Sequence, residues 1–231
     1  MAAKKYEVIY LNFLHKYNKV EKDKFKIGVA QIGLSTTGNL LTEFYDMTSD
    51  HLVRIKKEKL DEMLDKVKEK IEEAHQNGVN ILVFPEMTTD LNYNKMLKEI
   101  QELAEKYKMY IITGGYHDEE TKQNICVVLG PDGIRWDQEK HNPATIHFGK
   151  TAFTEAIHIA DPPHKIKIAE TEYGRIAIAI CRDFLDMDLR VELKNCEPPV
   201  DVVFNPAYSP VTADFDAIHF DVRRSVFAYS C

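Results

Sequence analysis

Short apolar runs rich in Val and Ile alternate along this chain with longer amphipathic segments, and this alternation constrains the fold more than any other feature. The apolar runs predict strands that are buried on both faces of a sheet. Apolar residues at helical spacing among Lys and Glu predict the helices between them. Such an alternation is typical of an α/β fold, in which helices cover the faces of the sheets. The predicted strands span residues 25–32, 80–85, 109–116, 123–130, 134–138, 165–170, 175–180, 201–206 and 225–230, and the predicted helices span 53–77, 94–108, 186–195 and 213–225.

The sequence predicts one large domain. A length of 231 residues exceeds the usual single-domain size of about 100–150, but it is ordinary for one α/β sandwich. This domain spans residues 25–231, and residues 1–24, which lack a clean period, are predicted to be an N-terminal extension over its surface. Long irregular segments are predicted at residues 33–50 and 137–164. A loop as long as that at 33–50 often borders a site. Pro131-Asp132-Gly133 predicts a hairpin, so the sheets should mix parallel and antiparallel strands.

The overall charge argues against two classes of partner. Thirty Lys and Arg residues against 37 Asp and Glu residues give a net charge of −7. Proteins that bind nucleic acids or anionic membranes normally carry an excess of positive charge. No apolar run approaches the roughly 18 residues needed to cross a bilayer, and the N-terminus is too rich in Tyr and Asn to be a signal peptide. A cytoplasmic protein without nucleic-acid or membrane partners is therefore expected.

The cysteines and histidines indicate neither a disulfide framework nor a metal site. Cys126, Cys181, Cys196 and Cys231 are few and irregularly spaced, and no CxxC pair occurs, so we interpret them as thiols. The nine histidines show no HxH or HExxH spacing. No metal or other cofactor is predicted.

Three predicted strands end in residues that can carry chemistry. Glu86 follows one apolar run, Lys140 follows another, and Cys181 ends a third. Sites in sheets of this type collect where strands end. A thiol exposed on a sharp strand-to-helix turn can attack a carbonyl carbon if a base and a local positive charge activate it. Glu86 can act as the base and Lys140 can supply the charge, which predicts acyl transfer.

Each residue also has an ordinary structural interpretation. An isolated cysteine at a strand end is most often a buried small hydrophobe, which is how we interpret Cys126. Glu86 alone would more often cap the following helix, and Lys140 would more often be a solvated charge. A papain-like Cys/His enzyme is disfavoured, because its cysteine should open a helix near the chain start rather than end a strand at residue 181.

The motifs around Glu86, Lys140 and Cys181 favour the catalytic interpretation over the structural one. VFPEM at 83–87, EKH at 139–141 and AICRD at 179–183 resemble, in this order, the Glu-Lys-Cys motifs of the nitrilase or carbon-nitrogen hydrolase superfamily. The resemblance runs from about Phe25 to the C-terminus, with FKIGVAQI, DVVFNPA and FDVRRSVFAYS similar to other segments of that family. It implies a four-layer αββα sandwich with mixed sheets.

The resemblance also implies roles for particular residues. Glu86 would be the general base, Lys140 would stabilise the tetrahedral oxyanion, and Cys181 would be the nucleophile. The backbone N–H of Arg182 would be a second oxyanion donor. Many members carry a second glutamate between the lysine and the cysteine, for which Glu155 is the best-placed candidate.

The implied function is that of a thiol amidohydrolase, which cleaves a non-peptide C–N bond of a small amide through an acyl-enzyme. Cys-Arg-Asp differs from the Cys-Trp-Glu typical of true nitrilases, which favours amides over nitriles. The alternative is a non-catalytic or regulatory module of the same fold within a larger assembly. Candidates for lining the substrate pocket lie just past strand ends: Tyr116, Asn205, Pro206 and Tyr208.

The resemblance further suggests that the domain is incomplete at its C-terminus, because chains of this family usually continue past the segment that resembles 225–230. A sheet that lacks its last strands exposes an edge that favours pairing. We therefore expect a homodimer, or docking on a fused or partner domain, through the helices at 186–195 and 213–225. The apolar side chains expected at that interface are Leu189, Leu193, Phe215, Ile218 and Val222.

Overall fold

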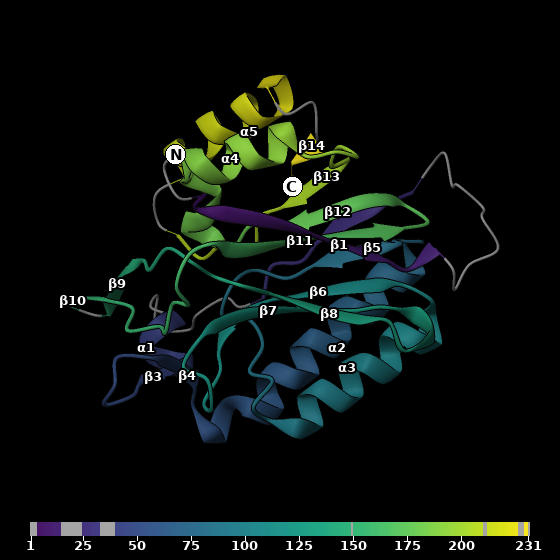
Figure 1. Cartoon of the computed structure of the whole chain (residues 1–231). Coiled ribbons are helices and arrows are strands. Elements are labelled where there is room, and N and C mark those ends of the chain that lie inside the picture. The colour runs from purple at the N-terminus through teal and green to yellow at the C-terminus, as the bar shows by residue number, and fades with distance from the viewer. Residues whose placement is uncertain are drawn as a thin grey trace.

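Two five-stranded sheets pack face to face, and a pair of helices covers the outer face of each sheet (Figure 1). The computed structural model describes residues 4–14, 25–32, 40–148, 150–209, 212–225 and 229–230. The four layers confirm the predicted αββα sandwich with mixed sheets. One sheet has the order β1 (Tyr6–Asn12), β11 (His164–Thr171), β12 (Gly174–Ile178), β13 (Val202–Phe204) and β14 (Tyr229–Ser230); the other has the order β2 (Ile27–Val29), β5 (Ile81–Val83), β6 (Tyr110–His117), β7 (Asn124–Leu129) and β8 (Arg135–Glu139).

The strands are apolar on both faces because each sheet lies between two apolar layers. Ile176 and Ile178 of β12 pack in the core between the two sheets, whereas Ala177 packs in the core beneath the outer helices. Successive side chains of a strand point to opposite faces, so a strand buried on both sides must be apolar throughout. This is the physical origin of the uninterrupted runs in the sequence.

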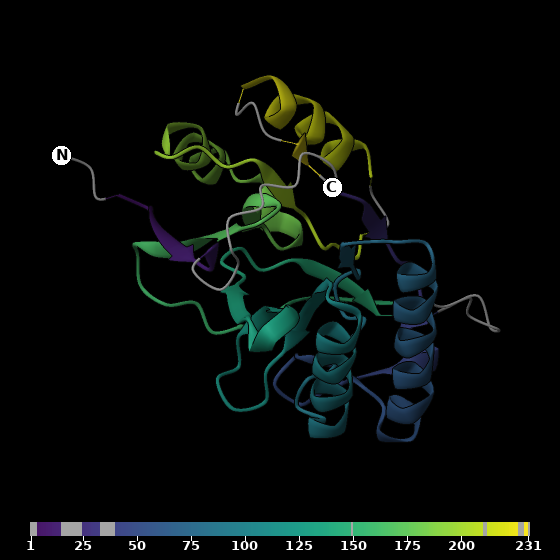
Figure 2. The same ribbon diagram turned by 90° about the vertical axis from the view of Figure 1, so that its right-hand side faces the viewer.

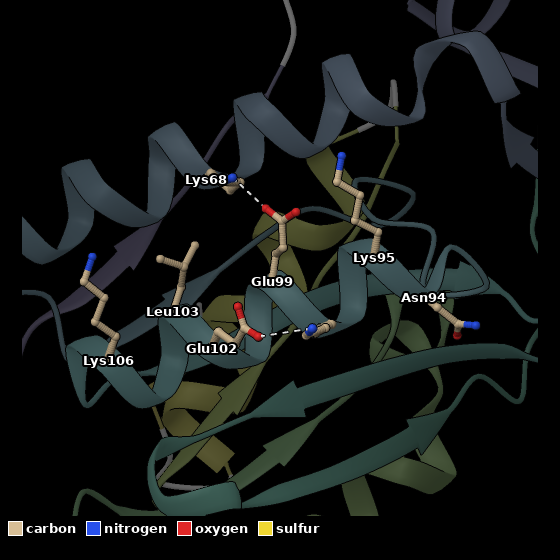
Figure 3. A pocket seen from close by; sticks show the side chains of 8 residues that line it. Lys68, Asn94, Lys95, Glu99, Glu102, Leu103 and Lys106 are labelled. Atoms are coloured by element: carbon tan, nitrogen blue, oxygen red, sulfur yellow. Dashed lines mark hydrogen bonds and ion pairs between the residues drawn. The ribbon is translucent and has the colours of Figure 1, made fainter.

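Each of the four long helices buries one face against a sheet and exposes the other face to solvent. Helices α2 (Leu60–Gln76) and α3 (Asn94–Tyr107) cover one sheet, and α4 (Met187–Asn195) and α5 (Ala213–Ser225) cover the other (Figure 2). Figure 3 shows the charged groove between α2 and α3, where Lys68 Nζ lies 2.6 Å from Glu99 Oε2. No helix in the described part of the chain is long and apolar enough to cross a membrane.

The N-terminal region departs from the prediction of an extension outside the domain. Residues 6–12 form β1, which pairs in parallel with β11 along its whole length, from Tyr6 opposite His164 to Asn12 opposite Glu170. Tyr6 is fully buried. The periodicity is hard to detect because β1 is an edge strand that mixes buried and exposed positions. Part of the predicted extension therefore belongs to the sandwich, while residues 15–24 lie outside the described residues.

The predicted loop at 33–50 and the start of the predicted helix at 53 also differ from the structure. A short helix, α1 (Leu40–Phe44), leads into a hairpin of β3 (Tyr45–Met47) and β4 (Val53–Ile55), and α2 begins only at Leu60. Val53 and Ile55 are buried on either side of a less buried Arg54, which is a strand period rather than a helical one. Residues 33–39 lie outside the described part of the chain.

The irregular segment predicted at 137–164 contains regular structure. Its first residues complete β8, and a two-stranded hairpin follows, with β9 (Thr145–Phe148) antiparallel to β10 (Thr151–Thr154). The hairpin predicted at Pro131-Asp132-Gly133 is confirmed, because it joins β7 and β8 in antiparallel pairing. Short strands with polar, exposed positions leave too weak a pattern for sequence periodicity to detect.

Candidate active site

The candidate site lies where strand ends of both sheets meet. Strands β5, β6 and β8 run in the same direction, since β7 is antiparallel to both β6 and β8. Their carboxyl ends therefore reach one edge, where Glu86 follows β5 and Lys140 follows β8. Cys181 follows β12 of the facing sheet and reaches the same cavity, whose volume is about 580 Å³. Glu86, Lys140, Glu155, Cys181 and Tyr208 all line it.

Lys140 is clamped between two carboxylates. Its Nζ atom donates to Oε1 of Glu86 at 2.8 Å and to Oε2 of Glu155 at 2.6 Å. All three side chains are at least 97 % buried, with exposed fractions of 1 %, 3 % and 0 %. The fold thus brings both predicted glutamates into contact with the predicted lysine, although Glu86 and Lys140 are 54 residues apart in the chain.

The clamp sets the charge of its members. Burial lowers the pKa of Lys140, but the charges of Glu86 and Glu155 outweigh it and raise that pKa above its ordinary value. Burial alone would raise the pKa of Glu155, but Lys140 and the His117 hydrogen bond outweigh it and lower the pKa to about 2. An ammonium group next to an ionised Glu155 is therefore the stable state at neutral pH.

Cys181 occupies a strained turn at the end of β12. Its φ angle of 46° lies in the left-handed region that non-glycine residues rarely adopt, at a cost of about 1–3 kcal/mol. Its backbone N–H donates to the carbonyl oxygen of Pro206 at 2.9 Å, which helps to hold the turn. The residue is only 4 % exposed, so the expectation of a thiol exposed at the sheet rim is wrong. Cys181 instead lies in the wall of the cavity that Glu86, Lys140 and Glu155 also line.

The environment of Cys181 keeps the thiol protonated at rest. Burial raises the pKa of Cys181, the charge of Glu86 raises it further, and the charge of Lys140 opposes them. The thiol consequently needs a base to become a nucleophile. Cys126 is fully buried in the core between the sheets, as its interpretation as a packing residue requires, and Cys231 lies outside the described residues.

Asn124, which no sequence pattern singles out, links the two carboxylates. Its Nδ2 atom donates to Oε1 of Glu86 at 3.0 Å and to Oε1 of Glu155 at 3.2 Å. Asn124 begins β7, beside Gly115 of β6, and a Cβ atom on Gly115 would lie 2.4 Å from Asn124 Oδ1. The Gly114-Gly115 pair was the available signal, because glycine in a buried strand marks a close approach of other groups.

Two further buried residues support the site. The ring of His117 contacts Glu155, with 2.8 Å between Nε2 and Oε1. Asp183 accepts hydrogen bonds from the backbone N–H groups of His141 and Asn142, at 3.0 and 2.7 Å, and so holds the segment that follows Lys140. Burial raises the pKa of Asp183 to about 7, although these hydrogen bonds oppose the shift.

The remaining predicted site residues divide between the cavity and its supports. Tyr208 lines the cavity, and its backbone N–H donates to Oε2 of Glu86 at 3.3 Å. Asn205 is not among the lining residues; its amide donates to the carbonyl oxygens of Ala179 and Cys181. Tyr116 is 8 % exposed and packs in the core beneath α2 and α3, so the structure does not place it on this cavity. Arg182 follows Cys181 in the 3₁₀ turn at Cys181–Leu185, with an exposed side chain.

No group of three or more His, Cys, Asp or Glu side chains within the described ranges is arranged to hold a metal ion. A buried thiol, a carboxylate and an ammonium group around one cavity are suited to hydrolysis through a covalent thiol intermediate.

The four layers define the αββα class of sandwich fold, and comparison with known proteins identifies the family of the chain. The chain belongs to the carbon-nitrogen hydrolase family, whose profile matches residues 44–189, more than half of its length. The chain is thus a hydrolase of C–N bonds by family. No curated protein matches the sequence significantly.

Solved structures share this fold at low sequence identity. A CN-hydrolase superfamily protein from Xanthomonas campestris, solved with an arsenic adduct in its active site, has 15% identity and a TM-score of 0.58, covering 74% of this chain and 68% of its own. A variant of the amidase from Nesterenkonia sp., solved after Michael addition of acrylamide at its active-site cysteine, has 11% identity and a TM-score of 0.56, covering 74% of this chain and 73% of its own.

Proposed function

We propose that this protein is a thiol amidohydrolase, which cleaves a non-peptide C–N bond of a small neutral amide through an acyl-enzyme on Cys181. The observation that carries the proposal is the convergence of Cys181, Glu86, Lys140 and Glu155 on one cavity. Members of a family that hydrolyses C–N bonds need a nucleophile, a base and an oxyanion donor at one place, and these four residues supply them.

In the acylation half-reaction, Glu86 takes the proton of the Cys181 thiol as the sulfur attacks the amide carbonyl carbon. The carbonyl oxygen becomes an oxyanion, which the Lys140 ammonium and the backbone N–H of Arg182 stabilise. Glu86 then returns its proton to the leaving nitrogen while the C–N bond breaks. The products of this half-reaction are a free amine or ammonia and a thioester on Cys181.

In the deacylation half-reaction, Glu86 takes a proton from a water molecule that attacks the thioester carbonyl. The same two donors stabilise the second oxyanion. The C–S bond then breaks, the sulfur recovers the proton from Glu86, and a carboxylic acid leaves. Glu86 therefore acts twice as base and twice as acid.

The preference for a neutral substrate follows from the lining. Among the described residues that line the cavity, Glu86, Lys140 and Glu155 are charged and already bind one another. The other described lining residues are uncharged: Gln31, Ile32, Leu41, Tyr45, Val53, Pro85, Met87, Thr88, Ala144, Thr145, Cys181, Ala207, Tyr208 and Ser209. An acyl chain with its own charge would lose hydration here without finding a free opposite charge among these described lining residues.

The proposal is tested by ammonia release from a series of small amides. We expect the wild-type chain to hydrolyse neutral aliphatic or aromatic amides in preference to amides that carry a carboxylate. Cys181→Ala should abolish turnover, because it removes the proposed nucleophile. Mass spectrometry of the wild type with substrate should show the acyl group on Cys181.

Cys196→Ala is the matched control, since Cys196 is also a buried thiol but follows the C-terminal end of α4 and is not among the residues that line the cavity. It should keep wild-type turnover. Turnover in Cys181→Ala would rule out the acyl-enzyme. A wild-type chain that hydrolyses no amide, with its Cys181 no more reactive toward iodoacetamide than Cys126 and Cys196, would instead support the non-catalytic alternative.

A further inference from the structure

His117 ends β6 behind the cavity wall and does not itself line the cavity. Its side chain is fully buried, as is that of Glu155, and the two lie 2.8 Å apart between Nε2 and Oε1. The nitrogen atoms of a buried imidazole ring are expected to have hydrogen-bond partners. The partners of the two nitrogen atoms therefore show which nitrogen carries the proton.

The second contact of the ring determines where its proton lies. The backbone N–H of Val53 donates to Nδ1 of His117 at 2.7 Å. Because a backbone N–H can only donate, Nδ1 must be the accepting nitrogen, and the proton of the neutral ring is on Nε2. The Nε2–H group then points at Oε1 of Glu155 and donates to it. A doubly protonated ring would place two N–H groups against each other at Val53.

The two oxygen atoms of Glu155 have separate partners. Oε1 accepts from Nε2 of His117 and from Nδ2 of Asn124, at 2.8 and 3.2 Å. Oε2 accepts from Nζ of Lys140 and from the backbone N–H of Ala144, at 2.6 and 2.7 Å. The donors on Oε1 fix the plane of the carboxylate, which leaves Oε2 directed at the lysine. A carboxylate with four donors is held as an anion in one orientation.

We propose that His117 is a positioning residue: as a neutral Nε2–H donor it orients Glu155, and through Glu155 it holds the Lys140 ammonium where the oxyanion forms. Val53 lines the cavity and donates to the same ring, so one side chain also ties the cavity wall at β4 to the lysine. The inference rests on the proposed acyl-transfer function, in which Lys140 stabilises the oxyanion.

Two amide substitutions separate the two hydrogen bonds of the ring. The side-chain nitrogen of Gln reaches the position of Nε2, so His117→Gln keeps a donor for Glu155 but loses the acceptor for Val53. The side chain of Asn reaches only the position of Nδ1, so His117→Asn keeps an acceptor for Val53 but leaves Glu155 without this donor. We expect His117→Asn to lower kcat about 10–100-fold with little change in KM, the usual scale for removing an orienting partner. His117→Gln should recover most of that loss.

Two readouts do not depend on turnover. The ¹⁵N spectrum of the wild-type imidazole should show the proton on Nε2 at neutral pH. The alkylation of Cys181 by iodoacetamide should be slower in His117→Asn than in His117→Gln, because a displaced Lys140 no longer favours the thiolate. A proton on Nδ1, or equal losses in both variants that follow their loss of stability, would overturn the inference. If the wild type hydrolyses no amide, the proposed function fails, while the spectrum and the alkylation rates still decide the role of His117.

Discussion

Lys140 contributes to stability as well as to the proposed chemistry. From the sequence, its replacement should leave stability nearly unchanged, because a lysine between strands is usually solvated. The structure reverses that expectation, since the ammonium neutralises two buried carboxylates. Lys140→Met should lower the free energy of unfolding by about 3–5 kcal/mol, because two buried carboxylates lose their common cation. It should also lower kcat roughly 10²–10³-fold.

Chemical denaturation of Lys140→Met beside Lys98→Met checks this prediction. Lys98 is 77% exposed and lies 3.8 Å from Glu102, so its replacement should change stability by less than about 0.5 kcal/mol. Equal stability of the two variants would mean that the buried clamp does not form.

Asp183 should make stability fall as the pH rises. Its pKa is raised by burial from an ordinary value near 4 to about 7 in the folded protein, so the folded state binds this proton more tightly than the unfolded state. The stabilisation is complete below about pH 4 and is lost as the pH rises to 7, with a slope of up to about 1.4 kcal/mol per pH unit. Glu155 has the opposite effect on stability. Its pKa is lowered to about 2 in the folded protein, so its contribution to stability is lost as the pH falls below about 4.5.

Urea unfolding between pH 4 and 8 measures this slope. Asp183→Asn cannot ionise and should show a flatter profile than the wild type. Asp65→Asn, an exposed site on α2, should keep the wild-type profile. If Asp183→Asn retains the wild-type slope, another group is responsible for it.

At the scale of the elements, the packing of the Asn124 side chain of β7 against β6 depends on Gly115. A Cβ atom there would lie 2.4 Å from Asn124 Oδ1 and 3.3 Å from Glu86 Cγ. Gly115→Ala should therefore push Asn124 away from both carboxylates. We expect a loss of about 1–3 kcal/mol of stability from the overpacking and a fall in kcat of about 10-fold or more.

Gly133→Ala is the control for this substitution. Gly133 lies in the turn between β7 and β8 with a φ of 72°, and a Cβ atom there would meet nothing within 4 Å. Its replacement should cost about 1–2 kcal/mol through the backbone alone and leave kcat unchanged. A fully active Gly115→Ala enzyme would show that Asn124 need not bridge the carboxylates.

The outer helices α4 and α5 also need a revised interpretation. Leu189, Leu193 and Val222, which the sequence assigned to an interface, are buried in the core of the same chain, with Phe215 and Ile218 packed against them. The helices look too apolar for an outer face because they cover a sheet that is apolar on both sides. Among the described residues of these helices, the large apolar side chains that are exposed are instead Met187, Val191 and Phe220.

At the scale of the whole molecule, we propose self-association of two copies through these exposed residues. An ion pair between Arg190 and Asp221 joins α4 to α5, the two helices that carry these exposed side chains. Phe220→Glu should shift the protein toward the monomer, because a buried carboxylate without a partner opposes association. Sedimentation over a concentration series measures the shift.

Met47→Glu is the matched control, since Met47 is 36% exposed on β3 beside the other helical layer (Figure 1). It should leave association unchanged. A wild-type chain that sediments as a monomer of 26.7 kDa at micromolar concentration would contradict the proposal.

The sandwich itself assembles the candidate site. Glu86 and Lys140 follow strands of one sheet, whereas Cys181 follows a strand of the other. The proposed base and nucleophile therefore come together only when the two sheets pack. Loosening of the core between the sheets should affect activity before it unfolds the chain, because a small separation is enough to part reacting groups.

Local patterns in the sequence determined the strands with both faces buried, the amphipathic helices and the residues at the strand ends, because each depends on side chains close together in the chain. Glu86, Lys140 and Cys181 were accessible in this way, whereas Glu155 came only from the resemblance to the nitrilase superfamily. The edge strand β1, the hairpin of β3 and β4, and the supports Asn124, His117 and Asp183 were decided by tertiary structure. Their positions depend on partners far away in the sequence, such as Val53 opposite His117 or Asp183 beneath His141. Burial, which turns these polar contacts into strong constraints, exists only once both sheets have packed.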